Sequence, residues 1–125
     1  MRVLLFALLL TACVPVRGSR IANAYPLPAT VHTAGGPIPV VLVDSLPATD
    51  SSFFVVGRFN YADRRIYVLA RVTSPLQRWR IVQHERCHVI LLESGLHNLT
   101  ESTFRELLCD AYAEDRVAEL VRGKP

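Results

Sequence analysis

The feature that most constrains this chain is an H-E-x-x-H string at residues 84–88, inside an apolar-rich segment that we expect to be helical. Residues four apart in a helix lie on one face, so His84 and His88 can bind the same tetrahedral zinc ion. Glu85, which lies between them, is then placed to activate a water bound to that ion. A fold built around this string must bring at least one further ligand to the same helix face.

The boundaries of two helices can be predicted around this string. The first is expected over residues 75–94. Its ends carry a capping serine, a proline at the first helical position and a glycine stop, which are Ser74, Pro75 and Gly95. The second is expected to begin with Thr100 or Ser102 as its cap and to continue to about Arg122.

The second helix offers a third ligand in Glu106. At 1.5 Å per residue, His88 lies ~10 Å before Gly95, and Glu106 lies ~9 Å after Thr100. If the helices are antiparallel, the two side chains therefore reach nearly the same level. Asp110 is one turn further and shares the face of Glu106, so its carboxylate can hold the free ring nitrogen of a zinc-bound histidine.

The segment before the helices predicts a small β-sheet. Residues 38–43 form a β-branched run that is expected to be a strand. Residues 53–59 and 66–72 are expected to pair as a β-hairpin around a turn at residues 60–65. At 125 residues the chain is long enough for one domain. The expected fold is α+β, with a small twisted antiparallel sheet of a hairpin plus one strand packed on two zinc-binding helices over residues 37–123.

The N-terminus predicts export. Residues 1–12 have an apolar run that is too short to span a bilayer, as in a signal peptide. The L-T-A-C sequence at residues 10–13 resembles the lipobox of bacterial lipoproteins. This resemblance implies cleavage before Cys13 and a lipid on its thiol. An ordinary secretory signal with an incidental cysteine is the alternative.

The same resemblance predicts where the protein resides. The protein is expected to be anchored to a membrane of the bacterial cell envelope through lipidated Cys13. Val14 fits sorting to the outer membrane, facing the periplasm. Residues 13–36, which are rich in proline, are expected to form a flexible tether.

The charge of the chain predicts no nucleic-acid partner. The formal net charge is +3, and the arginines are scattered rather than gathered in one stripe. A solvated basic face is therefore the favoured interpretation. The sequence does not indicate an oligomeric state.

H-E-x-x-H followed by E-x-x-x-D resembles the gluzincin metallopeptidases, and residues 106–113 are most similar to the E-x-x-A-D-x-[FY]-A stretch of the minimal gluzincin families. The similarity covers residues 51–121. It implies that His84, His88 and Glu106 bind one Zn²⁺ per chain, that Glu85 is the general base and that Asp110 supports a histidine. Larger gluzincins place an oxyanion-stabilising side chain in a later segment. His97, Tyr112 or Tyr67 could substitute for it, and a capping, packing or surface role is the alternative for each, while a second protein could also supply this group.

The resemblance also implies an endopeptidase whose edge strand pairs with an extended peptide or protein substrate. The residues expected to do so are Phe53, Phe54, Val55, Val56 and Gly57. Two alternatives to peptide hydrolysis remain open. One is a non-catalytic, lipid-anchored binding or assembly module with a structural zinc site. The other is an envelope lipoprotein whose H-E-x-x-H string is incidental.

Two cysteines remain if Cys13 carries lipid. Cys87 and Cys109 lie three residues after His84 and Glu106 respectively, and thus at matching levels of the two helices. In the families named above these positions usually hold Gly and Ala, where the helices approach closely. We therefore expect a Cys87–Cys109 disulfide in an oxidising compartment. Two buried free thiols, or a thiolate bound to the metal, are the alternatives.

Overall fold

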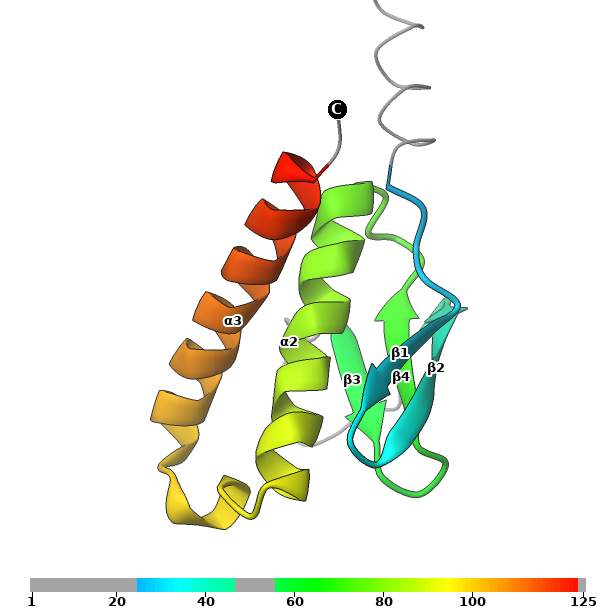
Figure 1. The fold of residues 1–125 in the computed structure, drawn as a ribbon. Helices are drawn as coiled ribbons and strands as arrows, with labels where there is room; N and C mark the ends of the chain where they lie inside the picture. Colours follow the sequence, from blue (N-terminus) through cyan, green and yellow to red (C-terminus); the bar gives the residue numbers. More distant parts are fainter. Residues whose placement is uncertain (1–24, 47–55, 124–125) are drawn as a thin grey trace, which may run out of the picture.

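The structure is a computed structural model that describes residues 25–46 and 56–123. The fold is α+β, as predicted. Four strands are followed by two long helices with a short 3-10 helix, η1, between them. The strands are β1 (Thr30–Thr33), β2 (Gly36–Val43), β3 (Gly57–Asn60) and β4 (Arg65–Leu69), and the helices are α2 (Pro75–Glu93), η1 (His97–Leu99) and α3 (Ser102–Arg122). Figure 1 shows α2 in the middle, with the sheet on one side and α3 on the other.

The sheet is mixed and has four strands, so the prediction of an antiparallel sheet of three strands was wrong. The predicted hairpin is confirmed, because β3 pairs with β4 in antiparallel fashion. The strand order is β1-β2-β4-β3, and β2 runs parallel to β4 while the other pairs are antiparallel.

Strand β2 lies inside the sheet although it contains Pro37 and Pro39, which have no N–H to donate. The Val40 N–H donates to Ala29 O on the β1 side. Main-chain groups point alternately to the two sides of a strand, so those of Pro37 and Pro39 face the β4 side. Pairing with β4 begins only at Val40, and the prolines therefore remove no hydrogen bond from that ladder.

The folded region begins before residue 37, which corrects the last part of the tether predicted over residues 13–36, while residues 13–24 lie outside the described residues. Thr30–Thr33 forms β1 and pairs with β2 through a tight turn, where Gly36 has a φ of 113°. The Trp79 indole N–H donates to Pro26 O over 3.0 Å and ties the incoming chain to α2. Thr30–Thr33 follows Pro26 and Pro28 and is too short to give a clear strand signal in the sequence. Its pairing with β2 makes it a strand. The predicted signal peptide and Cys13 lie outside the described residues.

The helix boundaries follow the local signals closely. Ser74 Oγ accepts a hydrogen bond from the Gln77 N–H, Pro75 begins α2, and Gly95 ends the turn with a φ of 77°. The cap of α3 was predicted wrongly, because Glu101 occupies that position without a side-chain hydrogen bond. The Thr100 hydroxyl instead donates to Leu96 O over 2.9 Å and closes the connection between the helices. None of the helices in the described ranges is long and apolar enough to cross a membrane.

The main hydrophobic core lies between the sheet and α2. It is built from residues of the four strands together with two side chains of α2, namely Val31, Ile38, Phe59, Ile66, Val68, Val82 and Val89. A second, smaller cluster lies between α2 and α3 and contains Cys87, Leu91 and Cys109, with Tyr112 packed against it. Helix α2 is therefore held on both faces, whereas α3 is held on one.

Candidate metal centre

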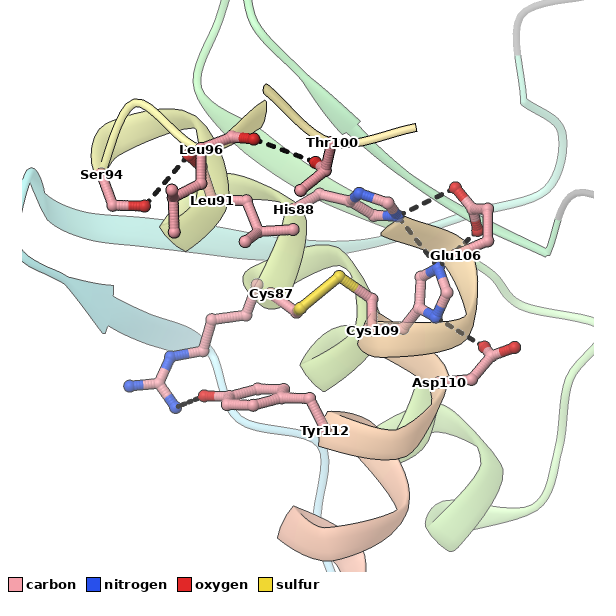
Figure 2. Close-up of a disulfide and its surroundings, with 12 residues drawn as sticks. Cys87, His88, Leu91, Ser94, Leu96, Thr100, Glu106, Cys109, Asp110 and Tyr112 are labelled. Carbon is pink, nitrogen blue, oxygen red and sulfur yellow. Dashed lines mark hydrogen bonds and ion pairs between the residues drawn. A yellow bond between two sulfur atoms is a disulfide. The ribbon is translucent and has the colours of Figure 1, made fainter. Parts of the chain in front are cut away.

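Helices α2 and α3 bring the three predicted ligands to one point. The His84 Nε2 lies 3.0 Å from Glu106 Oε2 and 3.1 Å from His88 Nε2. The His88 Nε2 lies 3.1 Å from Glu106 Oε1. In Figure 2 the His88 ring and the Glu106 carboxylate point toward each other from the two helices. These three residues form a group that can hold a metal ion.

The spacing and chemistry of this group fit a metal ion. Ligands bound at 2.0–2.1 Å in tetrahedral geometry lie about 3.3 Å from one another, close to the separations found here. An unprotonated ring nitrogen and a carboxylate oxygen are both acceptors, so atoms of this kind at contact distance need a proton or a cation between them. Two imidazoles and a carboxylate are also a common ligand set for zinc.

Asp110 orients one of the two histidines. Its Oδ1 lies 2.8 Å from His84 Nδ1, on the opposite side of the ring from the nitrogen that faces Glu106. A proton held on Nδ1 by this carboxylate leaves the lone pair on Nε2, which is the form a metal ligand requires. The sequence placed Asp110 beside a histidine without saying which one, and the structure selects His84.

Glu85 lies on the side of α2 that faces the sheet. Its Oε2 accepts a hydrogen bond of 3.1 Å from the main-chain N–H of Phe59 in β3. Burial is the largest influence and raises the pKa of Glu85 from 4.5 to about 7, although His84 and the Phe59 N–H both act to lower it. Glu106 acts to raise this pKa, so the Glu85 carboxyl is within electrostatic reach of the ligand group.

The pKa of His88 is lowered. Burial is again the largest influence, and it opposes the charged form of the ring. The charge of Glu106 acts in the opposite direction. A neutral imidazole is the form that binds a metal ion, so the surroundings of His88 favour the ligand state.

Strand β3 is an edge strand of the sheet formed by the described residues, and it lies next to Glu85. The Leu69 N–H donates to Val56 O, which makes this a hydrogen-bonded pair of the antiparallel ladder. Because such pairs alternate, the main-chain groups of Gly57 and Phe59 point away from β4. Of the predicted substrate-strand residues, Val56 and Gly57 are described, and Phe53, Phe54 and Val55 lie outside the described residues.

Gly57 allows β3 to approach α2 closely. A Cβ atom added at this residue would lie 2.1 Å from Ile81 Cγ2, far inside contact distance. This approach brings the Phe59 N–H within reach of Glu85. The contact between Glu85 and β3 had no signal in the sequence, because its donor is a main-chain group of a residue 26 positions away.

The predicted Cys87–Cys109 disulfide is confirmed, with the two Cα atoms 5.4 Å apart. Free thiols and a metal-bound thiolate are therefore excluded as descriptions of this pair. In Figure 2 the disulfide lies between Tyr112 and the pair formed by His88 and Glu106. The cross-link and the ligand group thus join the same two helices side by side.

The three side chains considered for oxyanion stabilisation lie in different surroundings. The Tyr67 hydroxyl donates to Asp63 within the hairpin. The Tyr112 hydroxyl accepts a 3.2 Å hydrogen bond from Arg86. The Nδ1 of His97 is buried, and no hydrogen-bond partner for it occurs within residues 25–46 and 56–123. Both tyrosines are therefore engaged in structural contacts.

Comparisons with protein-family models, curated proteins and solved structures found no match to this chain. The class of the protein therefore has to be argued from the geometry of the site.

Proposed function

We propose that this protein is a zinc-dependent metallopeptidase of the gluzincin type, which hydrolyses internal peptide bonds. One Zn²⁺ would be held by His84, His88 and Glu106, and Glu85 would be the general base. The observation that carries the proposal is the meeting of these three ligands beside a buried carboxyl that is bound to an edge strand. A structural zinc site would not require that carboxyl.

Zinc, when bound, would polarise the scissile carbonyl and lower the pKa of its water. Glu85 would accept a proton from the attacking water and deliver it to the leaving amine. A pKa near 7 suits both roles, because the group can then take up and release a proton near neutral pH. The Phe59 N–H would hold the carboxyl in place during both transfers.

An extended peptide would bind along the edge of β3 that faces away from β4. The Gly57 N–H and C=O and the Phe59 C=O face this edge, so they can pair with the main chain of a substrate. The Phe59 N–H donates to Glu85 and would therefore not bind the substrate. A hollow of about 490 Å³ at the end of β3 gives room for substrate side chains beside the strand, and it is lined by Arg58, Phe59, Asn60, Tyr61, Ala62 and Tyr67.

The second candidate is a lipid-anchored binding or assembly module that holds zinc without turnover. The contact of Tyr67 favours this candidate, because its hydroxyl already donates its proton to Asp63. In both candidates the protein would be exported and anchored to the envelope membrane through Cys13. A mass increase on the N-terminal peptide, lost in Cys13→Ala, would establish the lipid.

The deciding experiment pairs metal analysis with cleavage of a peptide library. The protein is expected to purify with about one zinc per chain. Glu85→Gln should keep the metal and lose turnover by at least about 10²-fold, which is the usual contribution of a general base. Glu101→Gln is the matched control, because Glu101 is exposed and makes no side-chain cap hydrogen bond. Full activity in Glu85→Gln would refute the mechanism, and zinc without cleavage would favour the module.

A further inference from the structure

The first two turns of α3, residues 102–108, contain no buried side chain, although Glu106 lies among them. The apolar residues of this segment face solvent, with Phe104 exposed to 54% and Leu107 to 62%. The packing that usually fixes a helix against its neighbour is therefore missing around the third ligand. The buried side chains of α3 begin at Cys109 and continue with Ala113 and Val117.

Two contacts hold this part of α3 in addition to those of Glu106 with His84 and His88. The Arg105 guanidinium donates to His97 O over 2.7 Å and to Thr100 O, which ties the helix to the connection before it. The other contact is the disulfide at Cys109, three residues after Glu106. The Arg105 contacts are local in the chain. Glu106 itself contacts His84 and His88, and apart from these ligand contacts the disulfide is the link at this level that joins the segment to α2.

The second end of the disulfide is equally close to the ligands of α2. Cys87 directly precedes His88 and lies three residues after His84. The cystine also makes up two of the three buried residues in the cluster between the helices, the third being Leu91. Cys87 and Cys109 therefore both cross-link the two helices and supply two of the three buried side chains between them.

We propose that the Cys87–Cys109 disulfide is the positioning element of the metal centre. It holds the Glu106 carboxylate at the level of His84 and His88, so the protein binds its metal tightly only when the disulfide is formed. The inference rests on the metal centre proposed above. It adds that the metal affinity of this chain depends on oxidation of a residue pair that does not bind the metal.

Linkage makes this dependence reciprocal. If the disulfide strengthens metal binding by a given factor, the metal must stabilise the disulfide by the same factor. Both cysteines are buried, with exposures of 5% for Cys87 and 0% for Cys109, so a reductant reaches the bond only when the helices separate. A metal ion that joins α2 to α3 opposes this separation.

The first test compares metal affinities, with Zn²⁺ measured by competition against a chromophoric chelator. The variant Cys87→Ala/Cys109→Ala is expected to bind about 10- to 100-fold more weakly than the oxidised wild type, as when a supporting contact of a metal ligand is lost. Val117→Ala is the control, since it removes buried packing from α3 but keeps the cross-link. A double variant within twofold of the wild type would overturn the proposal. No binding by the oxidised wild type would instead refute the metal centre itself.

The second test uses only the wild-type protein and therefore does not depend on the folding of a variant. A phosphine reduces the disulfide by two electrons, and water supplies the oxygen of the phosphine oxide and the two protons of the thiols. Thiol alkylation followed by mass spectrometry measures the rate. Saturating Zn²⁺ is expected to slow reduction, because a bound ion opposes the separation of the helices that exposes the disulfide to the phosphine. An unchanged rate would overturn the proposal. A faster rate would also overturn it, because the reduced protein would then bind Zn²⁺ more tightly through the thiolates of Cys87 and Cys109 than the oxidised protein does.

Discussion

The main-chain N–H of Phe59 donates a 3.1 Å hydrogen bond to the carboxyl of Glu85. This bond joins the edge strand of the sheet to the helix that carries both histidines. The group proposed to move protons and the strand proposed to bind the substrate are thus connected directly. The position of β3 relative to α2 therefore decides where the Glu85 carboxyl lies and whether it can fill the role proposed for it.

The first prediction concerns the pH dependence of stability in metal-free protein. The pKa of Glu85 is raised from 4.5 to about 7, so the folded state holds a proton that the unfolded state releases between these values. The free energy of unfolding should therefore fall as the pH rises through this window, by at most about 3 kcal/mol at 1.36 kcal/mol per unit. Glu85→Gln removes this contribution. Urea denaturation at about pH 5 and about pH 7.5 should show that the free energy of unfolding of Glu85→Gln rises relative to that of the wild type. The same difference at both pH values would contradict the raised pKa of Glu85.

The second prediction concerns the close approach of β3 to α2. Gly57→Ala would place a methyl group 2.1 Å from Ile81 Cγ2 and should lower the free energy of unfolding by about 1–3 kcal/mol, as overpacking does. Chemical denaturation measures this loss. In the double variant Gly57→Ala/Ile81→Ala the clash is removed, so the Gly57→Ala change should cost less there than in the wild type. Equal costs in the two backgrounds would show that the approach is not limiting.

The third prediction concerns the support of His84. Asp110→Ala removes the carboxylate that lies 2.8 Å from His84 Nδ1 and should weaken Zn²⁺ binding by about 10- to 100-fold. Asp115→Ala is the matched control, because Asp115 is exposed on the same helix. Chelator competition gives both dissociation constants. If the two variants bind equally well, Asp110 does not orient the ligand.

The fourth prediction concerns a contact at the end of α2. Glu93 accepts hydrogen bonds from Thr33 Oγ1 at 2.8 Å, Arg64 Nη2 at 2.9 Å and the Gly35 N–H at 3.2 Å, which joins both hairpin turns to the helix. Glu93→Gln should destabilise the fold by about 1 kcal/mol near neutral pH, because the ion pair is partly exposed. Glu101→Gln, which changes an exposed glutamate without such contacts, should have a much smaller effect in the same denaturation assay.

The same contact predicts a loss of stability in acid. Desolvation acts to raise the pKa of Glu93, but the hydrogen bonds from Thr33, Arg64 and Gly35 outweigh it, and the pKa is lowered from 4.5. A lowered pKa stabilises the fold above 4.5, and this contribution is lost as the pH falls through the pKa of the folded state. The difference between wild type and Glu93→Gln should therefore shrink below about pH 4.5. A difference that persists in acid would assign the effect to shape rather than to charge.

The helices could be predicted well because their signals are local. Ser74, Pro75 and Gly95 each act on the backbone within one turn, and the positions of Cys87 and Cys109 follow from the helical rise alone. The sheet could not be predicted equally well. The parallel pairing of β2 with β4 and the addition of Thr30–Thr33 as β1 depend on contacts between segments far apart in the chain.

By itself, the sequence determined the ligand types, their helical spacing and the level at which the two helices meet, because a helix has a fixed rise and period. Only the tertiary structure decided that Asp110 orients His84 and that the Phe59 N–H holds Glu85. It also showed that the turn of α3 that carries Glu106 has no buried side chain and lies next to the disulfide at Cys109. These relationships join separate elements through space, and their geometry is set by how the sheet and α3 pack on opposite sides of α2.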